Sequence, residues 1–207
     1  MLWILASLAA AAPAAHRPQL PPVDQCSSLP GFAAFRAKLE AAIARKDGKA
    51  LLAMTDPDID ISFGGDHGQA MFGKAWKLDQ PGTSPVWAEL TEMLRLGCAT
   101  DGTVASVPAL SSLLPEDYDV FETMIAVKPG SPLRAKPADG AKALTTLNWD
   151  IVEVSEWDGR ASWIPVKLAD GRRGFVRKDE VRSPGGYRAT FERVRGGWKI
   201  TTFLEGD

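Results

Sequence analysis

The sequence predicts an α+β protein, with N-terminal helices and a strand, a C-terminal β-hairpin, and a small all-β barrel between them. Three observations support this fold class. Apolar residues recur at helical spacing near the start of the chain, short alternating runs fill residues 126–184, and two further alternating runs flank a Gly-Gly pair in residues 185–207. The chain has 207 residues and a net charge of −2, so we expect no nucleic-acid partner.

The first 15 residues are apolar, carry no charged side chain and end in small residues. Ala12 and Ala14 form an A-x-A pattern, which predicts a secretory signal peptide and a periplasmic or secreted protein. The run is too short for a membrane span, so we expect no stable span after cleavage. An uncleaved anchor or a buried helix is the alternative. The proline-rich residues 16–30 predict a linker.

Cys26 and Cys98 are the two cysteines of the chain. In an oxidising compartment an even pair favours a disulfide, and two buried free thiols are the alternative. Beyond residue 16, His67 is the single histidine, so this part of the chain lacks the residues for a structural zinc site. We expect no metal and no cofactor.

Residues 31–125 are expected to form an α+β region. A helix is expected that Gly48 would end. Its apolar residues recur at helical spacing: Phe32, Phe35, Leu39, Ala42 and Ile43. A short helix is expected at 49–54. A third, at 84–97, has Ser84 as its N-cap and would carry Cys98 towards Cys26.

The stretch TDPDIDISFGGDHG, residues 55–68, alternates apolar residues with aspartates. Ile59, Ile61 and Phe63 would face inward and the aspartates outward, as in a strand with one solvated face. A calcium loop fails at its two most demanding positions, where Ile61 and His67 stand. The alternative is a pocket formed by Asp60, His67 and Trp76.

Residues 126–184 contain short alternating runs separated by turn residues. The runs are PLRAKP, AKALTTL, DIVEV and SWIPVKLADGRRGFV, and together they resemble bacterial SH3-like (SH3b) domains. Gly174 would let the backbone bend or approach another segment closely. Many SH3b domains have glycine in the turn where this chain has Asn148-Trp149-Asp150. The expected core residues are Leu133, Leu144, Leu147, Val152, Val154, Val166 and Val176.

The SH3b resemblance implies a non-catalytic module that binds cell-wall or peptide ligands. Four aromatic residues are candidates for the ligand surface: Trp149, Trp157, Trp163 and Phe175. The alternative is that such residues only cover the core of a small barrel.

The last residues, YRATFERVRGGWKITTFLEGD, predict a β-hairpin that turns at Gly196-Gly197. They are similar to the closing strands of NTF2-like α+β proteins. The hairpin would complete the region 31–125, with the barrel inserted between them. The alternative is a serial order in which the hairpin packs on the barrel.

We therefore expect an exported, non-enzymatic envelope protein that binds peptidoglycan or a protein partner. No serine or cysteine forms a recognisable nucleophile motif. The second hypothesis is an NTF2-like small-molecule binder or enzyme with the pocket at Asp60, His67 and Trp76. A third is a structural or immunity-type partner protein. The oligomeric state is left open.

Overall fold

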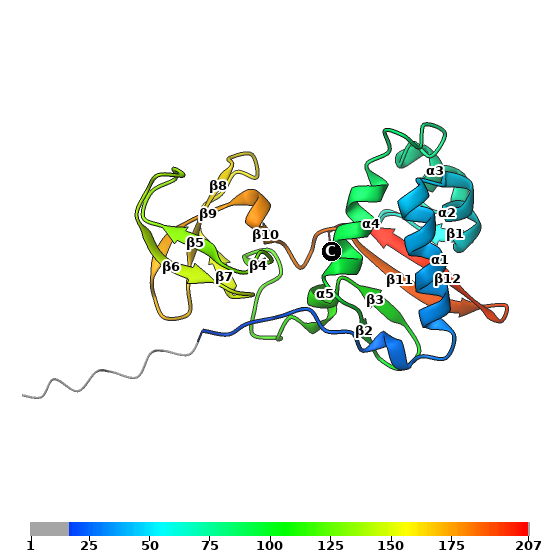
Figure 1. Ribbon diagram of the computed structural model, residues 1–207, viewed down its shortest axis with the longest axis horizontal. Helices are drawn as coiled ribbons and strands as arrows, with labels where there is room; N and C mark the ends of the chain where they lie inside the picture. The colour runs from blue at the N-terminus through cyan, green and yellow to red at the C-terminus, as the bar shows by residue number, and fades with distance from the viewer. Residues whose placement is uncertain (1–16, 207) are drawn as a thin grey trace, which may run out of the picture.

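A computed structural model describes residues 17–206, which form two units with one β-sheet each (Figure 1). The α+β prediction is confirmed, since helices accompany two mostly antiparallel sheets. The predicted signal peptide, residues 1–15, lies outside the described residues. Within residues 17–206, none of the helices has the length and apolar character needed to cross a membrane.

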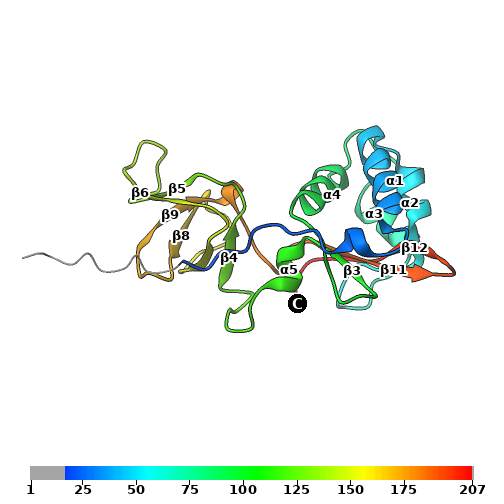
Figure 2. The ribbon, with the colours of Figure 1, turned by 60° about the horizontal axis from the view of Figure 1, so that its bottom comes forward.

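The first unit places its four longest helices on one face of its sheet (Figure 2). The predicted helices at the start of the chain and at 84–97 are present, although the third begins at Val86. The helices are η1 (Cys26–Ser28), α1 (Phe32–Arg45), α2 (Gly48–Met54), α3 (Gln69–Ala75), α4 (Val86–Arg95) and α5 (Ala109–Leu113). The strands are β1 (Thr55–Asp60), β2 (Ala99–Thr100), β3 (Ala105–Val107), β11 (Arg188–Val194) and β12 (Gly197–Leu204).

The C-terminal hairpin lies at the centre of the first sheet, whose order is β1-β12-β11-β3-β2. β12 pairs in parallel with β1, and β11 pairs antiparallel with β3. The turn of the hairpin is formed by Arg195 and Gly196, whose φ angles are 50° and 84°. It therefore lies one residue earlier than predicted, because a tight hairpin turn favours two positive φ angles.

The two faces of this hairpin differ as the alternating pattern requires. Phe191 and Ile200 are fully buried under the helices. On the other face, the hydroxyls of Thr190 and Thr201 lie 3.1 Å apart, and Thr201 also donates to Glu192. An antiparallel sheet can expose one polar face in this way because only its other face covers the core.

The second unit is a sheet of order β10-β4-β7-β8-β9-β5-β6. β4 and β10, its first and last strands, pair with each other, so the chain leaves and re-enters the first unit at neighbouring points. Among the described residues β10 and β6 are edge strands, so hydrogen bonding does not close the expected barrel. The strands are β4 (Thr123–Ala126), β5 (Ser131–Arg134), β6 (Ala143–Leu147), β7 (Ile151–Val154), β8 (Trp163–Lys167), β9 (Arg173–Arg177) and β10 (Val181–Arg182), and η2 (Lys178–Glu180) precedes β10.

Most of the expected core of the second unit is buried. The buried residues are Leu133, Leu147, Val152, Val166 and Val176. Val154 is partly buried, and the prediction for Leu144 is wrong, because it is 39% exposed on the edge strand β6. A Cβ atom on Gly174 would lie 2.7 Å from the carbonyl oxygen of Arg134, which confirms the expected close approach.

Residues 17–25, which we call the N-terminal strap, do not hang free as a linker (Figures 1 and 2). The strap pairs with the second unit, where Leu20 donates to the Trp149 carbonyl at 2.8 Å. It then pairs with the first unit, where the Cys98 amide donates to the Val23 carbonyl at 2.7 Å. The strap therefore joins both units by backbone hydrogen bonds. Its sequence has no periodic pattern that would predict them.

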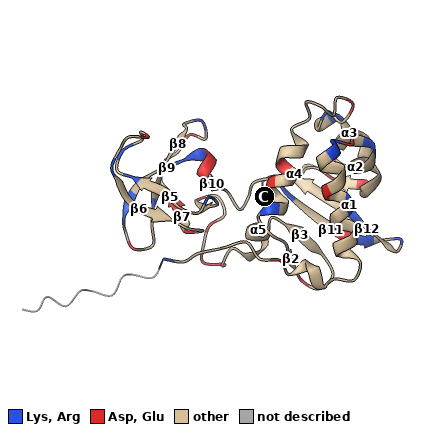
Figure 3. Cartoon of the chain, in the orientation of Figure 1, with Lys and Arg blue, Asp and Glu red and all other residues tan. Residues whose placement is uncertain are grey.

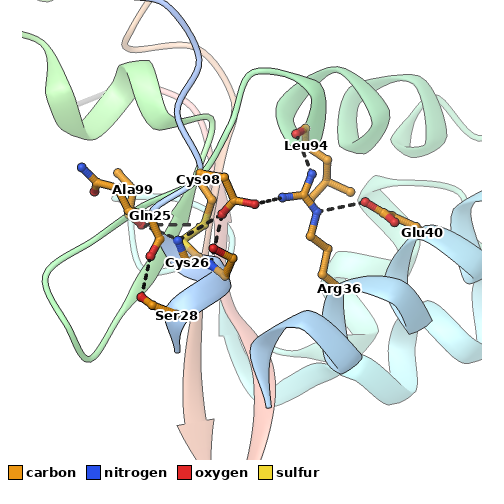
Figure 4. Close-up of polar contacts among 10 residues, drawn as sticks. Gln25, Cys26, Ser28, Arg36, Glu40, Leu94, Cys98 and Ala99 are labelled. Atoms are coloured by element: carbon orange, nitrogen blue, oxygen red, sulfur yellow. Dashed lines mark hydrogen bonds and ion pairs between the residues drawn. A yellow bond between two sulfur atoms is a disulfide. The ribbon is translucent and has the colours of Figure 1, made fainter. Parts of the chain in front are cut away.

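The end of the strap is fixed by the predicted disulfide between Cys26 and Cys98, which is confirmed (Figure 4). Both cysteines are fully buried. Beside them, Arg36 of α1 contacts three partners: Asp24 at 3.3 Å, Glu40 at 2.9 Å and the Leu94 carbonyl at 3.2 Å.

The two units share an apolar cluster. Leu96 follows α4 and Leu110 belongs to α5, and both pack with residues of β4 and β7 in the second unit. Leu20 of the strap and Trp149 pack against the same cluster. These contacts hold the units against each other.

Candidate functional site

The four aromatic candidates of the second unit lie in three different places. Trp163 of β8 pairs with Arg177 of β9, and Phe175 of β9 pairs with Pro165 of β8. Along both strands these residues alternate with buried ones, so Trp163 and Phe175 share the outer face of the sheet. The guanidinium of Arg177 lies 5.6 Å from the centre of the Trp163 ring, a cation–π distance. This face presents an aromatic and cationic surface.

Trp149 lies in a turn and packs against the apolar cluster between the units. Its φ angle is 62°, a left-handed conformation that glycine adopts most easily. Its ring is partly buried in the cluster between the units, and its carbonyl accepts the hydrogen bond from Leu20. At a backbone position that suits glycine, the chain thus has a residue that packs between the units.

Trp157 lies where the two units meet. It packs against the core of the second unit and lines a cleft of about 300 Å³. The ammonium of Lys178 lies 5.2 Å from the centre of its ring. From the first unit, Glu89 of α4, Tyr187 and Glu205 line the same cleft.

The three residues of the alternative pocket, Asp60, His67 and Trp76, do not form one site. Asp60 and His67 form an isolated β-bridge, which brings them side by side, but both are exposed. The imidazole Nδ1 of His67 lies 2.8 Å from the carbonyl oxygen of Gly65. Phe63, expected to face inward, is 58% exposed, because the strand ends at Asp60. Asp60 and His67 therefore face bulk water.

Trp76, the third residue of that alternative, is 8% exposed and packs edge-on against Tyr187 and Phe203. It lines a second cleft, of about 380 Å³, together with Glu89 and Tyr187. These two residues also line the cleft at Trp157. The two clefts thus adjoin, and we call them together the inter-unit groove.

An ion pair bridges the groove. Nη2 of Arg182 lies 2.6 Å from Oε1 of Glu89 and donates to the Tyr187 carbonyl at the same distance. The side chain of Arg182 is 14% exposed, so water screens the pair only partly. Burial and the carboxylates of Glu205 and Glu89 raise the pKa of Tyr187 above its ordinary value. Its phenol can donate a hydrogen bond.

Sequence reasoning missed Glu89, Arg182, Tyr187 and Glu205. They come from α4, β10 and the two ends of the hairpin, so no short motif contains them. The sequence signal for this region is VRSPGGY, which contains Arg182 and a Pro-Gly turn. At this turn the chain leaves the second unit. Interfaces between domains are frequent places for binding sites.

The groove has the properties of a binding site. It offers aromatic faces, a phenol and charged side chains of both signs. Within residues 17–206 there is no group of three or more His, Cys, Asp or Glu side chains arranged to hold a metal ion.

Comparison with protein-family models, with curated proteins and with solved structures gave no match for this chain. The resemblances to SH3b domains and to NTF2-like proteins therefore remain predictions from the residues quoted above.

Proposed function

We propose that the chain is an exported, non-enzymatic binding protein of the cell envelope, and that the inter-unit groove holds a peptide segment of peptidoglycan. The observation that carries this proposal is that Trp157 and Trp76, on different units, line two clefts that share Glu89 and Tyr187. The disulfide supports the exported location, because such bonds persist in oxidising compartments.

The charges of the groove suit a peptide with groups of both signs. Lys178 offers a donor to a carboxylate, and Glu205 offers an acceptor to an amine. Wall peptides carry both groups, and aromatic side chains add apolar contact area. The exposed Asp60 and His67 do not form part of this proposal.

Co-sedimentation of the processed protein with purified peptidoglycan tests the proposal. The groove variants are Lys178→Gln and Glu205→Gln, which change exposed side chains, and Trp157→Ala, whose fold is checked by its melting temperature. Trp163→Ala is the matched control, because this tryptophan also lies beside a cation but on the outer face. Removal of one charge-assisted contact should weaken binding about tenfold.

Loss of binding in the groove variants, with binding retained by Trp163→Ala, supports the proposal. Loss in Trp163→Ala alone would move the ligand to the outer face of β8 and β9. Absence of binding by the folded wild-type protein would overturn peptidoglycan as the ligand. Binding that does not respond to salt would contradict a role for the charges.

A further inference from the structure

A separate cleft of about 700 Å³ lies between α2, α3 and the turn that follows α3. Its walls include apolar surface from Leu52, Ala70 and Leu78. It shares no lining residue with the inter-unit groove. Its volume is within the usual range for sites that bind small molecules.

The rim of this cleft is cationic. Lys49 of α2, Lys74 of α3 and Lys77 line it, against a single acidic residue, Asp79. Figure 3 shows the lysines of α2 and α3 in blue. In the part of the chain that the structure describes, none of the three ammonium groups has an ion-pair or hydrogen-bond partner. Three exposed cations around an apolar floor thus remain available to an anion.

The walls of the cleft are held in place by two contacts. The side-chain amide of Gln69 donates to the carbonyls of Leu52 at 2.9 Å and Thr55 at 3.1 Å, which ties α3 to the end of α2. At the other end, a Cβ atom on Gly48 would lie 2.8 Å from the Leu78 carbonyl oxygen. The cleft is therefore formed before any ligand arrives, which lowers the entropic cost of binding.

Lys77 has a backbone conformation that suits glycine better. Its φ angle is 51°, and it follows Trp76, the C-cap of α3, at a position where glycine is the usual residue. Lys46 adopts the same conformation after α1, with a φ angle of 52°, but does not line the cleft. The chain therefore offers two lysines with the same backbone conformation, of which only Lys77 faces the cleft.

We propose that this cleft binds a small anionic amphiphile, with the apolar body on Leu52 and Leu78 and a carboxylate or phosphate head on the three lysines. An apolar body alone would leave the cations unused, and a bare anion would leave the apolar floor exposed to water. The site is distinct from the one proposed for wall peptide, so each proposal can fail alone.

Calorimetric titration of the processed protein tests this site. The probes are decanoate and decyl phosphate below their micelle concentrations, with decanol, acetate and inorganic phosphate as matched probes that lack the charge or the chain. We expect decanoate or decyl phosphate to bind at one site, more tightly than any of the three matched probes. The affinity should fall as salt is added.

Three kinds of variant test the charges of the cleft, its free volume and the backbone conformation of its rim separately. Lys49→Gln combined with Lys74→Gln should weaken binding at least about tenfold, whereas Lys38→Gln combined with Arg45→Gln, on exposed positions of α1, should not. Gly73→Leu should block the cleft, because its Cβ has room at 3.7 Å from Leu52 and the rest of the side chain fills the space.

Glycine substitutions give a readout that a purely structural role would not produce. Lys77→Gly and Lys46→Gly should each preserve or raise the melting temperature, but only Lys77→Gly should weaken binding. Equal binding of inorganic phosphate and decyl phosphate would overturn the amphiphile. Binding to anionic vesicles without binding to the monomeric probes would overturn the cleft, as would equal affinities of Lys77→Gly and Lys46→Gly.

Discussion

Nε of Arg17 lies 3.2 Å from Oδ1 of Asp150, a carboxylate whose side chain is 1% exposed. The contact is an ion pair without hydrogen-bond geometry. The other oxygen of Asp150 accepts a hydrogen bond from the Asn148 amide at 2.6 Å. One end of the strap is therefore held by charge and the other by the disulfide.

Replacement of Arg17 by alanine should destabilise the protein, because the buried side chain of Asp150 would lose its ion-pair partner. We expect the free energy of unfolding to fall by about 1–3 kcal/mol, since a buried pair loses more than an exposed one. Urea denaturation of the processed protein measures this. Asp150→Asn should cost less, because an amide oxygen can still accept from Asn148. Equal losses for Arg17→Ala and for Arg195→Ala, on an exposed turn, would contradict a role for the pair.

Removal of the disulfide should have a large effect, because Cys26 and Cys98 are 72 residues apart. In the chain-entropy model a loop of this length contributes roughly 4 kcal/mol. We expect Cys26→Ala combined with Cys98→Ala to unfold at a clearly lower urea concentration. The wild-type protein should show the same shift when reducing agent is added. A loss below about 1 kcal/mol would show that the strap contacts hold this end without the bond.

Gly97 should not tolerate a side chain. Its φ angle is 85°, and a Cβ atom would lie 2.3 Å from the Val23 carbonyl oxygen. We expect Gly97→Ala to cost roughly 2–4 kcal/mol, because both the conformation and the contact with the strap are lost. Gly196→Ala is the control, since Gly196 has a φ angle of 84° and open space around it. If both variants lose the same stability, the close approach to the strap is not important.

Asp101 should make stability depend on acid pH. The amides of Val104 and Thr103 and the Thr103 hydroxyl donate to its carboxylate and lower its pKa to about 2. Since the folded pKa lies below the unfolded one, its stabilising effect is present above about pH 4. It is lost as the pH falls towards 2. Melting temperatures of the wild type and Asp101→Asn should therefore converge between pH 5 and 2, and a constant difference would contradict this.

The elements that the sequence predicted are those with a regular period or a specific turn. The helix from Phe32, the strand around Ile59 and the C-terminal hairpin all show the spacing of one buried face, and all are present. The cysteine pair was predicted from compartment and number, and the helix that ends near Gly97 carries Cys98 to its partner. The part of the candidate site predicted in advance was limited to Trp157 and Trp76.

The tertiary structure alone decided which segments meet. Periodicity reports that a face is buried but not by which partner, so the central place of the hairpin and the edge position of Leu144 required the sheet order. The strap has no period because backbone hydrogen bonds, which need no repeating pattern of side chains, hold most of it. Glu89 and Arg182 are 93 residues apart, and only the packing of the two units makes them an ion pair. The sequence by itself thus determined the periodic elements and the disulfide, whereas long-range contacts determined the groove.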